Sequence, residues 1–219
     1  MRHWDWSPLG ISLKTSLCAT VIAFFLGIFA AWFVTGLRGK RKAVIDSILT
    51  LPLVLPPTVL GFFLLVIFGW NSPLGRCLRM IGVRIIFSWE ATVIAAAVVA
   101  FPLIYRTVLA AFEQIDTSIL DAARTLGLTE WTIFRRIMLP MAWPGCAAGM
   151  ILGFARALGE FGATLMIAGN IPHKTQTIPI AIWSAVEGNN MQTAMIWVLL
   201  IVGISSLVIL PLNLIPRKE

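Results

Sequence analysis

Five apolar segments, each long enough to cross a lipid bilayer, restrict the fold of this chain more than any other feature. They cover residues 11–35, 44–70, 91–111, 143–168 and 193–214. About 20 consecutive apolar residues in an α-helix match the roughly 30 Å hydrocarbon core of a bilayer. The chain is 58% hydrophobic and 12% charged, whereas soluble domains of this size rarely exceed about half apolar residues. The sequence therefore predicts an all-α fold, a polytopic transmembrane helical bundle with five spans.

The connections between the apolar segments are short, so we expect one transmembrane domain over residues 1–219 and no appended soluble domain. The first apolar run is longer than the roughly 7–15 residues of a signal-peptide core and is interpreted as a span. Residues 175–190, TQTIPIAIWSAVEGNN, contain an apolar patch that is too short to span. We predict an external or re-entrant helix there, with a sixth full span as the alternative.

The positive charges favour one side of the predicted membrane. Five spans put the two termini on opposite sides, and one side receives ten cationic residues against six on the other. The ten are Arg38, Lys40, Arg41, Lys42, Arg106, Arg124, Arg135, Arg136, Arg217 and Lys218, and the six are Arg2, Lys14, Arg76, Arg79, Arg84 and Lys174. Cytoplasmic loops carry the excess of Lys and Arg. We therefore predict an external N-terminus and a cytoplasmic C-terminus, and we attribute the net charge of +7 to this bias rather than to nucleic-acid binding.

A polar insert, residues 117–140, separates the third and fourth apolar segments and is expected to face the cytoplasm. Ser118 and Asp121 form an acidic variant of the capping box, which predicts a helix that begins near residue 118. Ala122 and Ala123 favour a helix and leave room for a partner surface to approach. Gly127 can adopt the left-handed conformation that ends a helix.

A second helix is predicted after this glycine, with Thr129 as its N-cap. Its apolar residues recur at helical spacing and are expected on one face; they are Trp131, Phe134, Ile137 and Met138. Pro140 disfavours helical geometry at Leu139, which predicts a bend there. Two plainer interpretations are an ordinary connector whose arginines set topology and a helix-turn-helix DNA reader. The short tethers to two spans argue against the second.

The insert resembles the EAA signature of ABC-importer permease subunits, E-A-A-x3-G-x9-I-x-L-P. The matching residues are Asp121, Ala122, Ala123, Gly127, Ile137, Leu139 and Pro140. The one departure is Asp for Glu, which keeps the carboxylate. In that family the loop forms a coupling helix that docks on a cytoplasmic ATPase subunit. The resemblance therefore implies a permease subunit with the type I ABC importer permease fold, driven by a motor on another polypeptide.

ATP hydrolysis is assigned to that partner because the sequence contains no phosphate-binding loop of the form G-x-x-x-x-G-K-[ST]. We expect no covalent catalysis and no bound cofactor in this chain, with ATP and Mg used by the ATPase. His173 stands alone and the three cysteines, Cys18, Cys77 and Cys146, are scattered, so neither a metal site nor a disulfide framework is predicted. The alternative is an ATP-independent anion channel, which would transport without an ATPase.

Two further stretches narrow the resemblance to permeases for tetrahedral oxyanions. They are LPLVLPPTVLGFFLL at 51–65 and FARALGEFGATLMIAGNIPHKTQTIPIAI at 154–182, and the second is nearer to molybdate than to sulfate permeases. The resemblance implies a bacterial or archaeal inner-membrane importer of molybdate, with tungstate and sulfate or thiosulfate as alternatives. It also implies a homodimer, two cytoplasmic ATPase subunits and an external oxyanion-binding protein.

Arg156 and Glu160 stand one helical turn apart in the fourth apolar segment and can pair on one face. Buried charges in a bilayer face the bundle interior or a cavity, so this is either a structural ion pair or part of an anion pathway. Pro56, Pro57 and Pro102 are expected to interrupt backbone hydrogen bonding in the second and third segments. They are interpreted as kinks, with a gate and simple curvature as the two alternatives.

Overall fold

The computed structural model describes residues 4–214, and the side chains of residues 4–210. Within these limits the chain is helical and contains no strand: α1 (Ser7–Thr35), α2 (Gly39–Val54), α3 (Pro57–Phe68), α4 (Pro73–Met80), α5 (Trp89–Glu113), α6 (Thr117–Thr125), α7 (Glu130–Ile133), α8 (Leu139–Met141), α9 (Trp143–Leu158), α10 (Gly162–Ala168), α11 (Ile178–Glu187) and α12 (Met191–Leu214). A π-helical turn, Phe134–Met138, joins α7 to α8. The predicted all-α fold is confirmed.

Three helices are long and apolar enough to cross a membrane as single rods, namely α1, α5 and α12. Two helix pairs with a sharp bend would each count as one further span. α2 and α3 meet at 110°, and the stretch Glu130–Met141 meets α9 at 73°. Together they give up to five spans, the predicted number. α11 has only 10 residues, so it is too short to be a sixth full span.

The fourth predicted span is wrong in its extent. Its helix α9 ends at Leu158, and a separate short helix, α10, covers Gly162–Ala168. Gly159 and Gly162 lower the helix propensity on both sides of the break. Phe161 takes the non-helical angles φ −126° and ψ −62°. The apolar run 143–168 is therefore two helices, and the stretch that bends into α9 begins before it, at Glu130.

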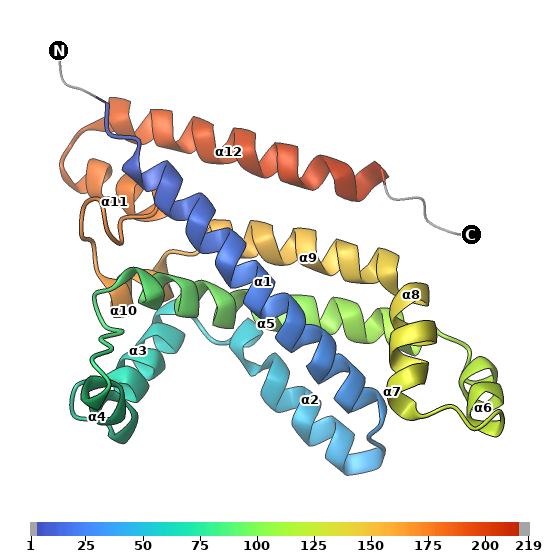
Figure 1. Ribbon diagram of the computed structural model, residues 1–219. Helices are drawn as coiled ribbons and strands as arrows, with labels where there is room; N and C mark the ends of the chain where they lie inside the picture. Colours follow the sequence, from blue (N-terminus) through green and yellow to red (C-terminus); the bar gives the residue numbers. More distant parts are fainter. Residues whose placement is uncertain (1–3, 215–219) are drawn as a thin grey trace.

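Three helices, α1, α5 and α9, pack against one another and form what we call the frame (Figure 1). Small side chains line their contacts, and Ala19 and Ala23 on α1 are fully buried. Ile104 of α5 is also fully buried, between Gly27 of α1 and Gly153 of α9, where a Cβ atom on either glycine would meet its side chain. Apolar burial drives helix association weakly in lipid, so close van der Waals packing of this kind holds the frame.

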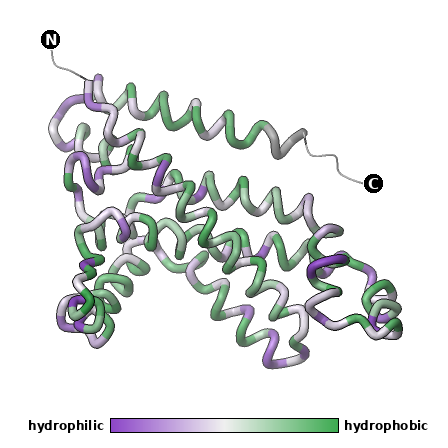
Figure 2. Tube along the Cα trace, in the orientation of Figure 1, coloured by the Kyte–Doolittle hydropathy of each residue, from purple (hydrophilic) through white to green (hydrophobic). Residues whose placement is uncertain are grey.

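Different helices lie at the two ends of the molecule. The start of α2, the end of α5 and helices α6, α7 and α8 lie at one end, while the start of α1, α4 and α11 lie at the other (Figure 1). Hydrophilic residues gather at these ends, and apolar residues cover the sides of the long helices (Figure 2). The fold therefore places the polar insert at the same end as the cationic start of α2, which begins at Gly39, within the predicted loop 36–43. The orientation in the membrane stays a prediction. Arg2, Arg217 and Lys218, which contribute to that prediction, lie outside the described residues.

Candidate functional site

The first helix of the polar insert, α6, begins at Thr117, one residue before the predicted start near residue 118. Asp116 is its N-cap, and its Oδ1 accepts a hydrogen bond from the backbone N–H of Ser118 at 2.9 Å. The predicted Ser118–Asp121 capping box is therefore wrong, because Asp116 already satisfies the backbone donor at 118. Asp121 is left free to make a different contact.

Asp121 takes part in a three-residue ion cluster that joins the two helices of the insert. Arg124 lies 2.8 Å from Asp121 Oδ1 and 2.7 Å from Glu130 Oε1. Hydrogen bonds from the Arg124 guanidinium hold the pKa of Glu130 below its usual range, and those bonds raise the pKa of Arg124 above its own. All three side chains are largely exposed, so the cluster fixes an angle between α6 and α7 rather than contributing much stability.

Gly127 takes the left-handed conformation predicted for it, with φ +79°. The N–H of Gly127 donates to the carbonyl of Arg124 at 2.9 Å, and the N–H of Leu128 donates to the carbonyl of Ala123 at 3.2 Å. This pair of bonds is a Schellman ending, in which glycine avoids the steric cost of a positive φ. The turn between α6 and α7 therefore depends on having no side chain at residue 127.

The two alanines of the insert point in different directions. Ala123 is 4% exposed and packs into the frame's core, whereas Ala122 is exposed. The expectation that both are open to a partner is therefore wrong for Ala123. The open surface of the insert carries apolar side chains instead, including Leu126, which is 81% exposed, and Ile119, which is 40% exposed.

The second helix begins as predicted, with Thr129 capping the N–H of Thr132 at 3.3 Å. Its apolar face is anchored on the frame by aromatic contacts. Phe134 lies 4.8 Å from Trp32 of α1 and 6.2 Å from Phe112 of α5, measured between ring centroids. The insert is thus fixed directly to two frame helices.

The predicted apolar stripe on this helix is only partly correct. Phe134 and Met138 are buried, Ile137 is half-buried, and Trp131 is 49% exposed. Ile133, which the spacing does not select, is fully buried. Both residues that depart from the predicted stripe, Trp131 and Ile133, precede the π-helical turn at 134–138, so that turn does not account for them.

The bend before α9 also lies elsewhere than predicted. Leu139 is helical, with φ −64° and ψ −44°, and the chain bends at Ala142, with φ −86° and ψ 1°. The N–H of Leu139 bonds to the carbonyl of Phe134, five residues back. This wider turn precedes Pro140, whose ring would collide with the carbonyl four residues earlier in a regular helix. The π turn therefore accommodates Pro140 without a bend at Leu139.

The Arg156–Glu160 pair forms as predicted, with 2.9 Å between Arg156 Nη1 and Glu160 Oε2. Glu160 lies outside α9, in the break, and its side chain is 2% exposed against 31% for Arg156. Its second oxygen, Oε1, accepts the N–H of Ala163 at 2.9 Å. One carboxylate therefore pairs with a cation at the end of α9 and satisfies a free backbone donor at the start of α10.

The Pro56–Pro57 sequence ends α2 and starts α3, which confirms the predicted interruption of the second span. Pro102 is different, because α5 continues through it unbroken from Trp89 to Glu113. The two breaks lie against each other. A Cβ atom on Gly162 would come within 3.2 Å of Pro57 Cβ, and one on Gly61 within 2.8 Å of Ala163 Cα.

Sequence comparison identifies the group to which this chain is related. A family described as binding-protein-dependent transport system inner membrane component matches residues 23–218. The chain belongs to this family of inner-membrane transport components. It is therefore a multi-pass inner-membrane permease subunit, as the EAA resemblance implies.

Among the relatives in this family, the putative molybdenum transport system permease protein YvgM of Bacillus subtilis is 44% identical, over 93% of this chain and 90% of its own. The molybdenum transport system permease protein ModB of Escherichia coli K12 is also 44% identical, over 84% and 80%. The sulfate transport system permease protein CysT of the same strain is 32% identical, over 95% and 75%.

Solved structures of transporters support the permease fold. A bacterial ABC transporter for import of the acidic polysaccharide alginate superposes with a TM-score of 0.76 at 16% identity, over 94% of this chain and 77% of that one. The MetNI methionine ABC transporter, in an inward-facing conformation, superposes with a TM-score of 0.73 at 18% identity, over 96% and 95%. The predicted permease fold is confirmed.

Proposed function

We propose that this chain is the membrane subunit of an ABC importer for molybdate. The observation that supports the substrate is the 44% identity to molybdenum permeases along most of the chain, against 32% to a sulfate permease. Two copies form the path, an external oxyanion-binding protein delivers the anion, and two cytoplasmic ATPase subunits supply the energy. The chain itself binds no cofactor; ATP and Mg belong to the ATPase subunits.

The polar insert is the joint with the ATPase. It carries exposed apolar side chains next to an exposed ion cluster, and it is fixed to α1 and α5 through Phe134. The insert carries several exposed apolar residues, namely Ile119, Leu126, Leu128 and Trp131, and a concentration of exposed apolar surface suits a protein interface. The orientation follows: α6, α7 and the C-terminus face the cytoplasm, and the N-terminus faces outward.

Transport then proceeds by a rigid-body switch. ATP binding draws the two ATPase subunits together, the two joints move with them, and the pair of permeases changes from inward-open to outward-open. The anion released from the binding protein passes through when ATP is hydrolysed. Gates and pathway belong to the region where the breaks at Pro56–Pro57 and Glu160 meet, since interrupted helices at membrane depth line a cavity or are buried in protein.

Within this region, Arg156 and Glu160 are assigned a structural role. Both oxygens of Glu160 are already bonded, one to Arg156 and one to the Ala163 amide. A buried carboxylate also repels a dianion, and a guanidinium that held molybdate tightly would slow its passage. The pair therefore fixes the break between α9 and α10.

The substrate is tested by reconstituting the permease with its ATPase in liposomes and adding binding protein loaded with one anion at a time. We expect molybdate-loaded binding protein to stimulate ATP hydrolysis and to be accompanied by uptake. Stimulation by the sulfate-loaded protein alone would replace molybdate by sulfate. Uptake with no ATPase present would identify an anion channel and overturn the importer assignment.

The joint is tested by Gly127→Val. Valine is strained at φ +79°, by about 1–3 kcal/mol for a non-glycine residue held in this region, so the turn between α6 and α7 must distort. We expect normal insertion but loss of coupling between ATP hydrolysis and uptake. Gly203→Val is the matched control, because nothing lies within 4 Å of a Cβ there. Normal uptake by Gly127→Val would contradict the joint, as would failure of a crosslinker at exposed Ala122 to capture the ATPase.

A further inference from the structure

Helix α2 lies outside the frame, beside α5, and buries little of its surface (Figure 1). None of its residues is fully buried. Ile45 and Leu49 are half-buried against the core of the frame. Apolar packing alone therefore holds α2 weakly, and its position must depend on other contacts.

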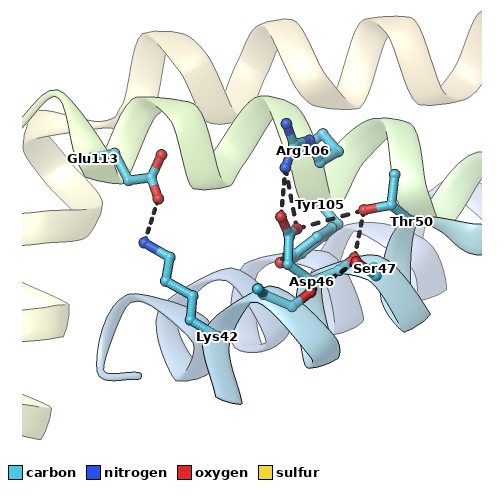
Figure 3. A network of polar contacts seen from close by, with 8 residues as sticks. Lys42, Asp46, Ser47, Thr50, Tyr105, Arg106 and Glu113 are labelled. Carbon is cyan, nitrogen blue, oxygen red and sulfur yellow. Dashed lines mark hydrogen bonds and ion pairs between the residues drawn. The ribbon is translucent and has the colours of Figure 1, made fainter. Parts of the chain in front are cut away.

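Polar contacts supply what packing does not (Figure 3). Arg106 Nη1 donates to both oxygens of Asp46, at 3.1 and 2.9 Å, and the hydroxyl of Tyr105 donates to Asp46 Oδ1 at 2.8 Å. Lys42 Nζ lies 2.7 Å from Glu113 Oε1. We call these five residues, Lys42, Asp46, Tyr105, Arg106 and Glu113, the clamp. They join α2 to α5 and to no other helix.

The two ion pairs of the clamp stand in line along antiparallel helices. Lys42 and Asp46 are one turn apart on α2 and share a face, while Arg106 and Glu113 lie two turns apart on α5. Two contacts at separate heights orient α2 against both sliding and pivoting on α5, although each ion pair is partly exposed and contributes little stability by itself. A single pair would leave it free to pivot.

Asp46 is the most important residue of the clamp because its carboxylate accepts a hydrogen bond from a fully buried residue. Tyr105 is 0% exposed, and its hydroxyl donates to the Asp46 carboxylate. A buried hydroxyl that loses its partner is left with an unpaid desolvation penalty. The bonds from Arg106 are charge-assisted and reach both carboxylate oxygens, which fixes direction as well as distance.

The clamp lies between the joint and the meeting point of the breaks. Glu113 is the last residue of α5, and Asp116, the N-cap of α6, follows three residues later. At its other end α2 stops at the Pro56–Pro57 break, beyond which α3 packs on α10 with Gly61 against Ala163. The first half of α5 also packs directly on α3, where Ala95 and Val99 share a buried core with Leu64. The second half of α5, which carries the clamp and leads to the joint, reaches the Pro56–Pro57 break through α2, provided that α2 follows α5.

We infer that the clamp makes α2 and α5 move as one body, so that a displacement of the joint is delivered to the Pro56–Pro57 break. Its residues are positioning residues, which touch neither anion nor nucleotide. The inference rests on the proposed coupling to an ATPase. It adds that α2 moves together with α5, and so with the frame, and that the pivot is the break rather than the contact between α2 and α5.

A covalent clamp provides the first test. Cys18, Cys77 and Cys146 are replaced by serine, Lys42→Cys and Glu113→Cys are introduced, and a short bifunctional thiosulfonate joins the two thiols in the reconstituted complex. The untreated double-cysteine chain lacks the Lys42–Glu113 ion pair and is expected to couple poorly. If α2 follows α5, crosslinking brings uptake per ATP hydrolysed to within about twofold of that of the cysteine-free chain, the scale of a coupling free energy near zero. Loss of uptake on crosslinking, with the cysteine-free chain active, would show that α2 must leave α5 and would overturn the inference.

Charge changes provide the second test. Lys42→Glu and Glu113→Lys are each expected to lower uptake per ATP hydrolysed by about fivefold or more, the scale of a coupling free energy between sites, and the double swap to restore it. Lys40→Glu is the control, a cation on the same helix that makes no ion pair among the described residues. Equal uptake by Lys42→Glu and Lys40→Glu would overturn the inference.

A rescue experiment separates a role in coupling from a role in folding. Asp46→Asn is expected to keep ATP hydrolysis while uptake falls, and the 42–113 crosslink in the same chain is expected to restore uptake. An Asp46→Asn protein that couples normally would overturn the inference. If the unmodified complex hydrolyses ATP without taking up molybdate, the proposed function itself fails, which is a result distinct from any of these.

Discussion

The frame and the meeting point of the two breaks lie side by side in the molecule but are held together differently. In the frame, uninterrupted helices approach through glycine and alanine, with Ile104 enclosed between Gly27 and Gly153. At the breaks the backbone stops being helical, and a buried carboxylate, Glu160, bonds to a cation and to a backbone amide. Continuous helices satisfy their own backbone in lipid, whereas an interruption needs polar side chains to do so. Shape therefore fixes the frame, and charge fixes the break between α9 and α10.

The largest expected loss of stability comes from a substitution that fills the closest contact within the frame. A Cβ at Gly153 would overlap the Ile104 side chain, so Gly153→Val should cost about 2–3 kcal/mol through overpacking. That corresponds to a fall in melting temperature of roughly 5 °C, measured by tryptophan fluorescence in detergent. Gly203→Val, with no atom near its Cβ, should leave the melting temperature unchanged. Equal behaviour of the two variants would mean that packing does not hold the frame.

The next largest loss of stability is expected when the cation at the break between α9 and α10 is removed. Arg156→Ala leaves the buried Glu160 carboxylate without its cation, which should cost about 2 kcal/mol after allowance for the partial exposure of Arg156. Glu160→Gln keeps an oxygen for the Ala163 N–H and should cost less, about 1 kcal/mol. Melting temperature and assembly with the ATPase are measured. If Arg156→Ala assembles, hydrolyses ATP and unfolds normally but takes up no anion, Arg156 belongs to the pathway instead.

The smallest loss of stability is expected in the exposed ion cluster of Asp121, Arg124 and Glu130. It serves as the solvent-exposed comparison for the buried Arg156–Glu160 pair. Glu130→Gln should cost less than about 1 kcal/mol, because the Arg124–Glu130 contact is solvent-exposed. The pKa of Glu130 is lowered in the folded protein from its ordinary 4.5, chiefly by hydrogen bonds from Arg124. Its contribution is therefore complete above that ordinary value and is lost as the pH falls through the lowered pKa. The stability difference between wild type and Glu130→Gln should vanish in acid; a difference that grows in acid would contradict this sign.

Much of the polar insert could be predicted from local sequence. Gly127 takes its positive φ and Thr129 caps its helix because both effects depend on neighbours within a few residues. The cap at Asp116 was missed because Ser118 competes as a plausible cap three residues before an acid. The helical Leu139 was missed because a π turn, which no simple spacing rule predicts, makes room for Pro140.

The contacts between distant segments could not be predicted. Asp46 and Arg106 are 60 residues apart, and in the sequence each is only a charge near the edge of an apolar run. Gly162 and Pro57 are likewise far apart in the sequence, and only the fold brings them into contact. By contrast, Arg156 and Glu160 were paired correctly because four residues separate them, although the helix they were expected to share ends between them.

The sequence by itself determined that the chain lies in a membrane, that up to five segments can cross it, and where the polar insert lies. These follow from runs of apolar residues and from a motif with fixed spacing, both of which are local. Only the tertiary structure decided that the fourth apolar segment is also broken, that its break meets the one at Pro56–Pro57, and that ion pairs join α2 to α5. The reason is physical: a buried charge or an interrupted helix is stable only beside a particular partner, and the fold, rather than distance along the chain, brings that partner within reach.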